Sequence, residues 1–316
     1  DSAVASSRAA AGGILFAGSG SIATATASST VYATLERATQ IDGELELLAN
    51  AERRASATST SVAHGALASG ASLSTANNTG TTTALLSGEV LGAGNVQVLA
   101  QADDSASAQS TAGAGGLAAI GNGSAASATV APTVQATMTG DAQIEGDLAV
   151  TARSLYQATA TATGVSASGI NIGTSSAAAT ATPQVIATIS SDTVSAGGDL
   201  NLAAYANDDN RIGLSATASA SAGNFFGLAT GQGTQSSVVL KATTRAGVAE
   251  NTSLQAGGDL NVIAKANHLV NAVSIGKAGG VAAFGATLAD LSLTADTRAI
   301  IGDNAQLFAD GGGAIL

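Results

Sequence analysis

The 316-residue chain is acidic, and both its charge content and its content of large side chains are low. It contains no cysteine, so disulfides, thiolate catalysis and cysteine-ligated metals are excluded. Its net charge of −11, from 22 acidic and 11 basic residues, argues against nucleic acid as a partner, because phosphate binding needs clustered Lys and Arg. Hydrophobic residues make up 45% of the chain but aromatic residues only 3%, so alanine supplies much of the apolar content. This predicts a thin core between closely spaced backbones.

The sequence shows neither a membrane-spanning helix nor a signal peptide. Apolar runs such as 9–18 and 278–286 are far shorter than the roughly 18–20 residues that a membrane-spanning helix requires, so no membrane span is predicted. The N-terminus lacks the basic start, apolar core and cleavage site of a signal peptide.

The two ends of the sequence resemble the middle of the chain. Repeat arrays need polar capping repeats, and neither end looks like a cap. We therefore expect the chain to be an excerpt of a longer array.

Two sequence phrases recur along the chain with a common period. The first is a glycine turn, an acidic or amide residue and an alternating apolar run, as in SAGGDLNL (195–202) and QAGGDLNV (255–262). Its marker glycines are Gly43, Gly94, Gly146, Gly198, Gly258 and Gly311, separated by 51, 52, 52, 60 and 53 residues. The second phrase closes at Gly18, Gly70, Gly121, Gly173, Gly227 and Gly285. Residues 1–316 are therefore predicted to be a single continuous array of about six repeats of about 52 residues.

One repeat, taken in chain order, predicts strands separated by turns. GDLAVTAR (146–153) alternates apolar and polar residues, and LYQATATATGVSASG (155–169) continues the alternation with Ala and Thr. INIG (170–173) predicts a glycine corner, TSSAAATATPQVIATI (174–189) a second long strand, and SSDTVSAG (190–197) a turn. Helix is disfavoured because the period is two, because Thr, Val and Ser are poor helix formers, and because glycines interrupt each long segment.

This pattern predicts an all-β fold, a parallel β-solenoid (β-helix). Its coils would stack at about 4.7–4.9 Å, with glycines at corners that need positive φ. The spacing leaves open whether about 52 residues form one wide coil or two coils. The longer period late in the chain predicts insertions within 231–258 and 259–285.

Acidic and amide residues after the glycine turn are interpreted as structural. Asp147, Asp199 and Asp259, with Asn95 in the equivalent place, fit turn-capping positions because Asn and Asp side chains hydrogen-bond nearby backbone.

The sequence offers little chemistry, and we expect a protein that is not an enzyme. His64 and His268 occupy different repeat positions, which favours surface or structural roles. Asp208 and Asp209, in ANDDN (206–210), are weak candidate ligands for Ca²⁺, although a solvated turn is the favoured interpretation there and in QADDS (101–105). No catalytic, cofactor-binding or other metal-ligating residue is predicted.

The phrase AGGDLNV, followed by Ala/Thr alternation and a glycine–apolar–glycine corner, resembles the repeat regions of large bacterial filamentous adhesins. These include filamentous-haemagglutinin and leukotoxin-like families and the passenger regions of some autotransporters. One departure is the corner, where those families often carry a longer Val-rich run and this chain is short and rich in Ala and Ser. The resemblance implies export to the bacterial cell surface, a right-handed parallel β-helix and a stalk or adhesive role.

From this we expect a non-catalytic structural stalk or filament. Its partners would be neighbouring repeats, further copies of itself end to end, and a host or biofilm surface. The alternative is an ice-binding or carbohydrate-binding solenoid that uses Thr and Ser ladders, as in TATAT (159–163). The Thr positions do not keep a strict register in every repeat, which counts against that alternative.

Overall fold

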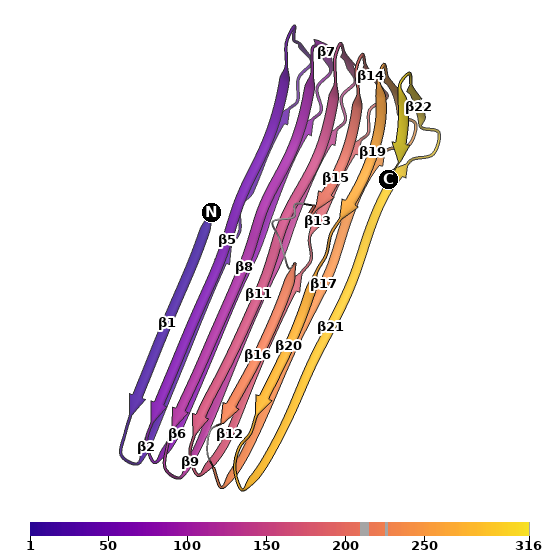
Figure 1. The fold of residues 1–316 in the computed structure, drawn as a ribbon. Coiled ribbons are helices and arrows are strands. Elements are labelled where there is room, and N and C mark those ends of the chain that lie inside the picture. The colour runs from indigo at the N-terminus through magenta and orange to yellow at the C-terminus, as the bar shows by residue number, and fades with distance from the viewer. Residues whose placement is uncertain (209–214, 225–226, 316) are drawn as a thin grey trace.

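The computed structural model describes residues 1–208, 215–224 and 227–315. These residues form strands, turns and bends and contain no helix, which confirms the predicted all-β parallel solenoid. The strands belong to three parallel sheets, two long and one short, and every pairing between strands is parallel (Figure 1).

Each sheet takes one side of every coil. The first sheet contains β1 (Ser2–Gly12), β5 (Leu45–His64), β8 (Val96–Gly115), β11 (Leu148–Ala167), β15 (Leu200–Ala206), β16 (Ala216–Asn224), β19 (Asp259–Ala266), β20 (Val270–Lys277) and β23 (Gly312–Ile315). The second sheet contains β2 (Phe16–Ala27), β3 (Thr30–Leu35), β6 (Leu67–Leu86), β9 (Ala119–Met138), β12 (Ile170–Ala181), β13 (Gln184–Ile189), β17 (Ala229–Val248) and β21 (Ala282–Ile301). The short sheet contains β4 (Thr39–Gln40), β7 (Val90–Ala93), β10 (Ala142–Ile144), β14 (Thr193–Ala196), β18 (Ser253–Ala256) and β22 (Gln306–Ala309).

The strand register shows that each repeat is one wide coil. Leu148 pairs with Val96 on one side and with Leu200 on the other, and each partner is one full repeat away in the chain. A complete long strand has 20 residues, which makes a coil about 66 Å wide at about 3.3 Å per residue. Two stacked coils per repeat are therefore excluded.

The extra residues of the longest repeat lie elsewhere than predicted. Ser154 pairs with Ala206, but a few residues later Ala158 pairs with Ala216, so six of the eight extra residues fall between residues 206 and 216. The predicted range 231–258 contains one extra residue, because Ile189 pairs with Val248 but Thr193 pairs with Ser253. The prediction was wrong for the rest, because glycines one full coil apart measure only the length of that coil. They cannot locate the additional residues within it.

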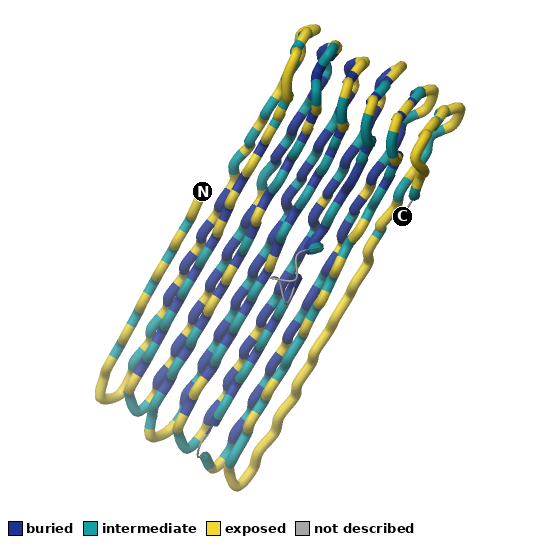
Figure 2. Tube along the Cα trace, turned by 45° about the horizontal axis from the view of Figure 1, so that its top comes forward, coloured by how far each residue is buried: buried dark blue, intermediate teal, exposed yellow. Residues whose placement is uncertain are grey.

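The interior is built mostly from small side chains, and its composition changes from one end of the coil to the other. Inward positions alternate with outward ones along the long strands of the inner coils, as the burial colours of Figure 2 show. Near the short sheet the interior holds large residues such as Leu86, Met138 and Leu148, while Ala57 and Ser110 occupy it farther along. Toward the tight corner the interior also holds the buried side chains of Ile120, Asn122 and Gln232.

Most glycines are needed because adjacent coils stack closely, and not because the backbone requires a positive φ. Among the described glycines only Gly92, with φ of 72°, lies in the left-handed region, and INIG (170–173) lies inside β12. The corner prediction was therefore wrong for INIG. A Cβ on Gly198 would lie 2.1 Å from Asp147 Oδ1, and one on Gly257 would lie 2.3 Å from the carbonyl oxygen of Gly197. The recurring AGGD phrase is thus explained by coils that approach too closely for a side chain.

Candidate functional site

A column of polar residues runs through the interior along the stacking direction. Arg53 in β5 pairs in register with Asp104 in β8, which in turn pairs with Tyr156 in β11. All three point inward, because each occupies an inward position of its strand's alternation. Three successive coils therefore place ionisable or polar groups at the same place between the long sheets.

Arg53 and Asp104 form an enclosed ion pair. Arg53 Nε donates to Asp104 Oδ1 at 2.7 Å and Nη2 donates to Oδ2 at 3.0 Å, and neither side chain is exposed. Arg53 Nη1 reaches the second sheet, where it donates to the Thr82 hydroxyl at 3.1 Å and to the Ser29 carbonyl at 3.3 Å. Asn78 Nδ2 donates to the Arg53 carbonyl at 2.7 Å. Burial raises the pKa of Asp104, and Arg53 opposes that rise.

The column continues at Tyr156 into a neutral network. The Tyr156 hydroxyl lies 2.6 Å from His268 Nδ1, and the Tyr156 backbone N–H donates to Asn207 Oδ1 at 2.8 Å. Asn207 has φ of 50° and donates from Nδ2 to the Ser215 hydroxyl at 2.9 Å, which closes the ends of the insertion. Burial raises the pKa of Tyr156 and lowers the pKa of His268, so both groups are neutral near pH 7. The tautomer of the neutral His268 ring sets which of the two groups donates in this contact.

The two histidines stay apart, as the sequence indicated. His64 is exposed at the end of β5, whereas His268 is partly buried against Tyr156, 112 residues earlier in the chain. Sequence reasoning missed this contact because its partners lie two coils apart and no local pattern joins them.

The predicted weak calcium ligands do not form a site among the described residues. Asp208 is paired with Lys265, whose Nζ lies 2.6 Å from Asp208 Oδ1, and Asp209 lies outside the described residues. QADDS (101–105) lies within β8 and not in a turn. In the described part of the chain no group of three or more His, Asp or Glu residues could hold a metal ion.

The acidic residues of the glycine turn form a hydrogen-bonded ladder. The backbone N–H of Asp147 donates to Asn95 Oδ1 at 2.9 Å. The N–H of Asp199 donates to Asp147 Oδ1, and the N–H of Asp259 to Asp199 Oδ1, each at 2.8 Å. The carboxylates of Asp147 and Asp199 thus cap a backbone group of the next coil, which supports the structural interpretation of these residues.

Uncharged polar side chains fill the interior near the corner. Asn122, Asn171 and Gln232 are buried, and each has amide atoms without a hydrogen-bond partner among the described residues. A Cβ on Gly173 would lie 2.4 Å from Asn122 Oδ1 and 2.6 Å from Gln232 Oε1, so glycine gives these two amides their space. Buried amides of this kind are usually satisfied by ordered water, and they supply no proton for acid–base chemistry.

No helix that could cross a membrane occurs in the described residues. Comparison with known proteins gives no match among family models, curated proteins or solved structures.

Proposed function

We propose that this chain is part of a non-catalytic structural stalk or filament of an exported bacterial surface protein. The observation that carries the proposal is the residue-for-residue stacking of whole coils, in which one repeat adds one coil and nothing else. Such an array lengthens in proportion to the number of repeats.

The stacking also supplies stiffness. Separating two neighbouring coils breaks two long ladders at once, as with β5 on β8 and β6 on β9, each of which pairs along 20 residues. Bending the array would stretch the ladder on one long face while compressing the ladder on the other. A wide, flat coil therefore suits a strut.

The placement of the reactive groups supports a non-catalytic role. The side chains of Arg53 and Asp104 are fully enclosed, so no substrate reaches the strongest charge pair of the interior. The accessible acidic residues Asp147 and Asp199 are used in backbone capping. Catalysis needs unlike groups that converge on an accessible point, and these groups do not.

Location and partners rest on the family resemblance. We propose an extracellular or cell-surface position, end-to-end contact with further repeats, and attachment to a host or biofilm surface. The absence of cysteine is compatible with export in an unfolded state. Labelling of intact cells of the source organism with an antibody against the array would support this location, and labelling only after lysis would contradict it.

The rod itself is tested by duplicating an internal coil. A second copy of residues 96–147, inserted after Asp147, keeps the register because Val96 and Leu148 are equivalent. Electron microscopy should then show growth of about 4.8 Å per duplicated coil along one axis, with unchanged width. Particles in which no dimension grows by about 4.8 Å per added coil would refute the strut.

Outward hydroxyls on the first sheet favour a second candidate, the binding of ice or carbohydrate. Thr159, Thr161 and Thr163 point outward from β11 and have outward neighbours on adjacent strands. Those neighbours are Ser107, Gln109 and Thr111 in β8, and Thr217, Ser219 and Ser221 in β16. Thermal hysteresis that is lost in Thr161→Leu would support ice binding, and retention on insoluble polysaccharide would support carbohydrate binding. Failure of both assays would remove this candidate.

A further inference from the structure

The outer face of the second sheet carries a stripe of exposed apolar side chains beside the tight corner. We define this corner stripe as the outward positions of 14–22, 65–73, 117–125, 168–176, 227–235 and 280–288, one range in each of the six coils. Thirteen of the 24 exposed large apolar side chains of the described residues lie in it. They are Ile14, Leu15, Phe16, Ile22, Leu67, Leu73, Leu117, Ile170, Ile172, Leu228, Val281, Phe284 and Leu288. This concentration marks an interaction surface, because soluble monomers rarely expose a continuous apolar patch of this kind.

The corner stripe is also free of charge. None of its six ranges contains Asp, Glu, Lys, Arg or His. The first sheet, by contrast, presents charged side chains along its strands, among them Arg8, Arg54, Asp103 and Lys265. A chain with a net charge of −11 repels its own copies, and a charge-free face is where two such chains approach at least cost.

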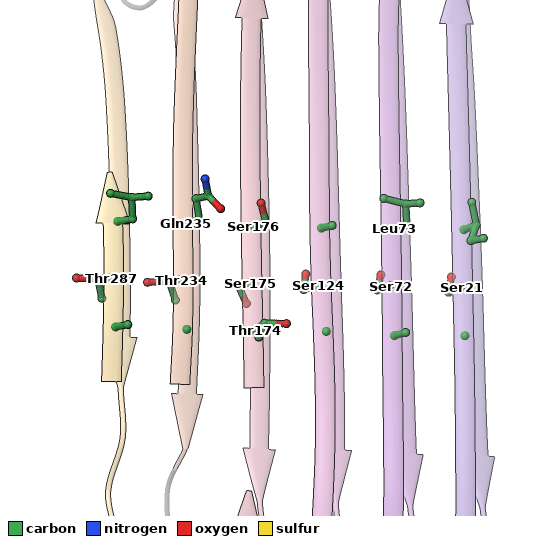
Figure 3. A pocket seen from close by; sticks show the side chains of 18 residues that line it. Ser21, Ser72, Leu73, Ser124, Thr174, Ser175, Ser176, Thr234, Gln235 and Thr287 are labelled. Carbon is green, nitrogen blue, oxygen red and sulfur yellow. The ribbon is translucent and has the colours of Figure 1, made fainter. Parts of the chain in front are cut away.

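Two grooves follow the stacking direction along this stripe. The larger, about 940 Å³, is lined by three consecutive residues from each of six neighbouring strands and by no residue of the first sheet, so it lies on the outer surface. Figure 3 shows the middle row of its lining, Ser21, Ser72, Ser124, Ser175, Thr234 and Thr287, of which the first five are buried on the inner side of the sheet. Outward Gly20, Ala71 and Gly123 leave the groove shallow and open. Ile22, Leu73 and Leu288 form ridges beside its two ends, and small or polar residues occupy the same column between them. A second groove of about 510 Å³ runs parallel to it between Phe16 and Ile172.

The spacing of ridge and groove selects the partner. Outward positions along the stripe repeat once per coil, at about 4.8 Å, and only a partner with the same repeat can match them over the whole length. A second copy of this chain has that repeat, and a two-fold arrangement would put the ridge of each copy into the groove of the other. The area of the stripe follows from its six coils of about 4.8 Å and its width of seven residues of about 3.3 Å. The contact would bury about 650 Å² on each copy, or about 1,300 Å² in total, which is within the size range of stable interfaces.

We propose that two copies of this chain associate laterally through the corner stripe of the second sheet. The contact is side by side and differs from end-to-end stacking, so it does not depend on the stalk function. The duplicated-coil experiment measures length along the axis, whereas the experiment below measures mass, so each proposal fails separately.

The test is sedimentation of the full chain and of matched charge variants at micromolar concentration. The wild-type chain should form dimers, and Leu73→Glu should weaken dimerisation by at least about tenfold, because a carboxylate would be desolvated in the contact. Val165→Glu is the control, because Val165 and Leu73 are each 40% exposed but Val165 lies on the opposite face, in β11. Circular dichroism should show the same strand signal in all three chains.

Cross-linking provides an independent readout in this cysteine-free chain. An equimolar mixture of Ala71→Cys and Leu73→Cys chains should form a covalent dimer on mild oxidation, because the two-fold contact places the ridge position of one copy opposite the groove position of the other. Thr58→Cys on the first sheet should not form one. A wild-type chain that stays monomeric, or an equal loss of association in Leu73→Glu and Val165→Glu, would overturn the proposal. So would a monomer that binds neutral lipid vesicles through Leu73, because the stripe would then be a membrane-binding face.

Discussion

Removing one partner of the buried Arg53–Asp104 pair should destabilise the array far more than removing both. Asp104→Ala leaves a guanidinium that is fully enclosed and has no counter-ion, since Arg53 otherwise reaches only the Thr82 hydroxyl and the Ser29 carbonyl. Breaking a buried pair in this way typically costs about 3–5 kcal/mol. Replacing both partners with apolar residues of similar size is often neutral or favourable, so Arg53→Met/Asp104→Leu should lie within about 2 kcal/mol of the wild type.

The two single variants should also differ in their response to pH. Arg53 cannot lose its proton, but Asp104 can become neutral, and burial already raises its pKa. In folded Arg53→Met the Asp104 carboxyl then binds a proton. The unfolded chain releases this proton, because its carboxyl has an ordinary pKa of about 3.9. Stability should therefore rise as pH falls through the raised folded pKa. In Asp104→Ala this titration is absent.

The measurement is urea unfolding, followed by circular dichroism at pH 7 and pH 5, of four chains that form a closed cycle: the wild type, Arg53→Met, Asp104→Leu and Arg53→Met/Asp104→Leu. Asp104→Ala is measured beside them. The coupling between the two sites should be at least about 2 kcal/mol, which is typical of residues in direct contact. Equal slopes against urea in all four chains are needed for the comparison, because a changed slope reports a changed unfolded or partly folded state. Single variants within about 1 kcal/mol of the wild type, or additive effects in the double variant, would refute the reasoning.

Three further predictions concern the stacking and the neutral network. Gly198→Ala should cost about 1–3 kcal/mol, because its Cβ would meet Asp147 Oδ1 at 2.1 Å, whereas Gly231→Ala, with open space around its Cβ, should be nearly neutral; thermal melting compares them. Asp199→Asn keeps an acceptor for the Asp259 N–H and removes a like charge, so this variant should melt no lower than the wild type. Asp199→Ala removes the acceptor and should lose about 0.5–1.5 kcal/mol of stability. A lower melting temperature for Asp199→Asn than for Asp199→Ala would contradict this account. His268→Gln should flatten the pH dependence of melting between pH 7.5 and 5. The lowered pKa of His268 means that its stability contribution is present above the ordinary value of about 6.5 and is lost as pH falls; an unchanged pH profile would count against this assignment.

The period and the alternation made the fold predictable from sequence. A parallel stack repeats the same environment once per coil, so the AGGD phrase and the inward alanines recur at the coil length. The residues of the interior column were not predictable in the same way. Arg53, Asp104 and Tyr156 are unlike one another, so they share a position without sharing a pattern. The insertion next to Asn207 was misplaced for a related reason, since the marker glycines fix the coil length but not the point where extra residues leave the ladder.

In-register stacking also accounts for the low charge of the chain. A charged residue at a repeated outward position stands about 4.8 Å from its equivalent in the next coil, and each like-charged neighbour then costs about 0.9 kcal/mol even in bulk water. The array tolerates the column of Asp147, Asp199 and Asp259 because two of these carboxylates accept a backbone N–H from the next coil, and an amide, Asn95, begins the ladder. Elsewhere opposite charges face each other across coils, as do Arg245 and Asp296 at 2.5 Å. Ser, Thr, Ala and Gly fill most of the remaining outward columns. In the corner stripe such columns also carry Leu, Ile and Phe. The repulsion between stacked like charges, which keeps charged residues out of these columns, therefore leaves there an uncharged apolar face suited to another copy.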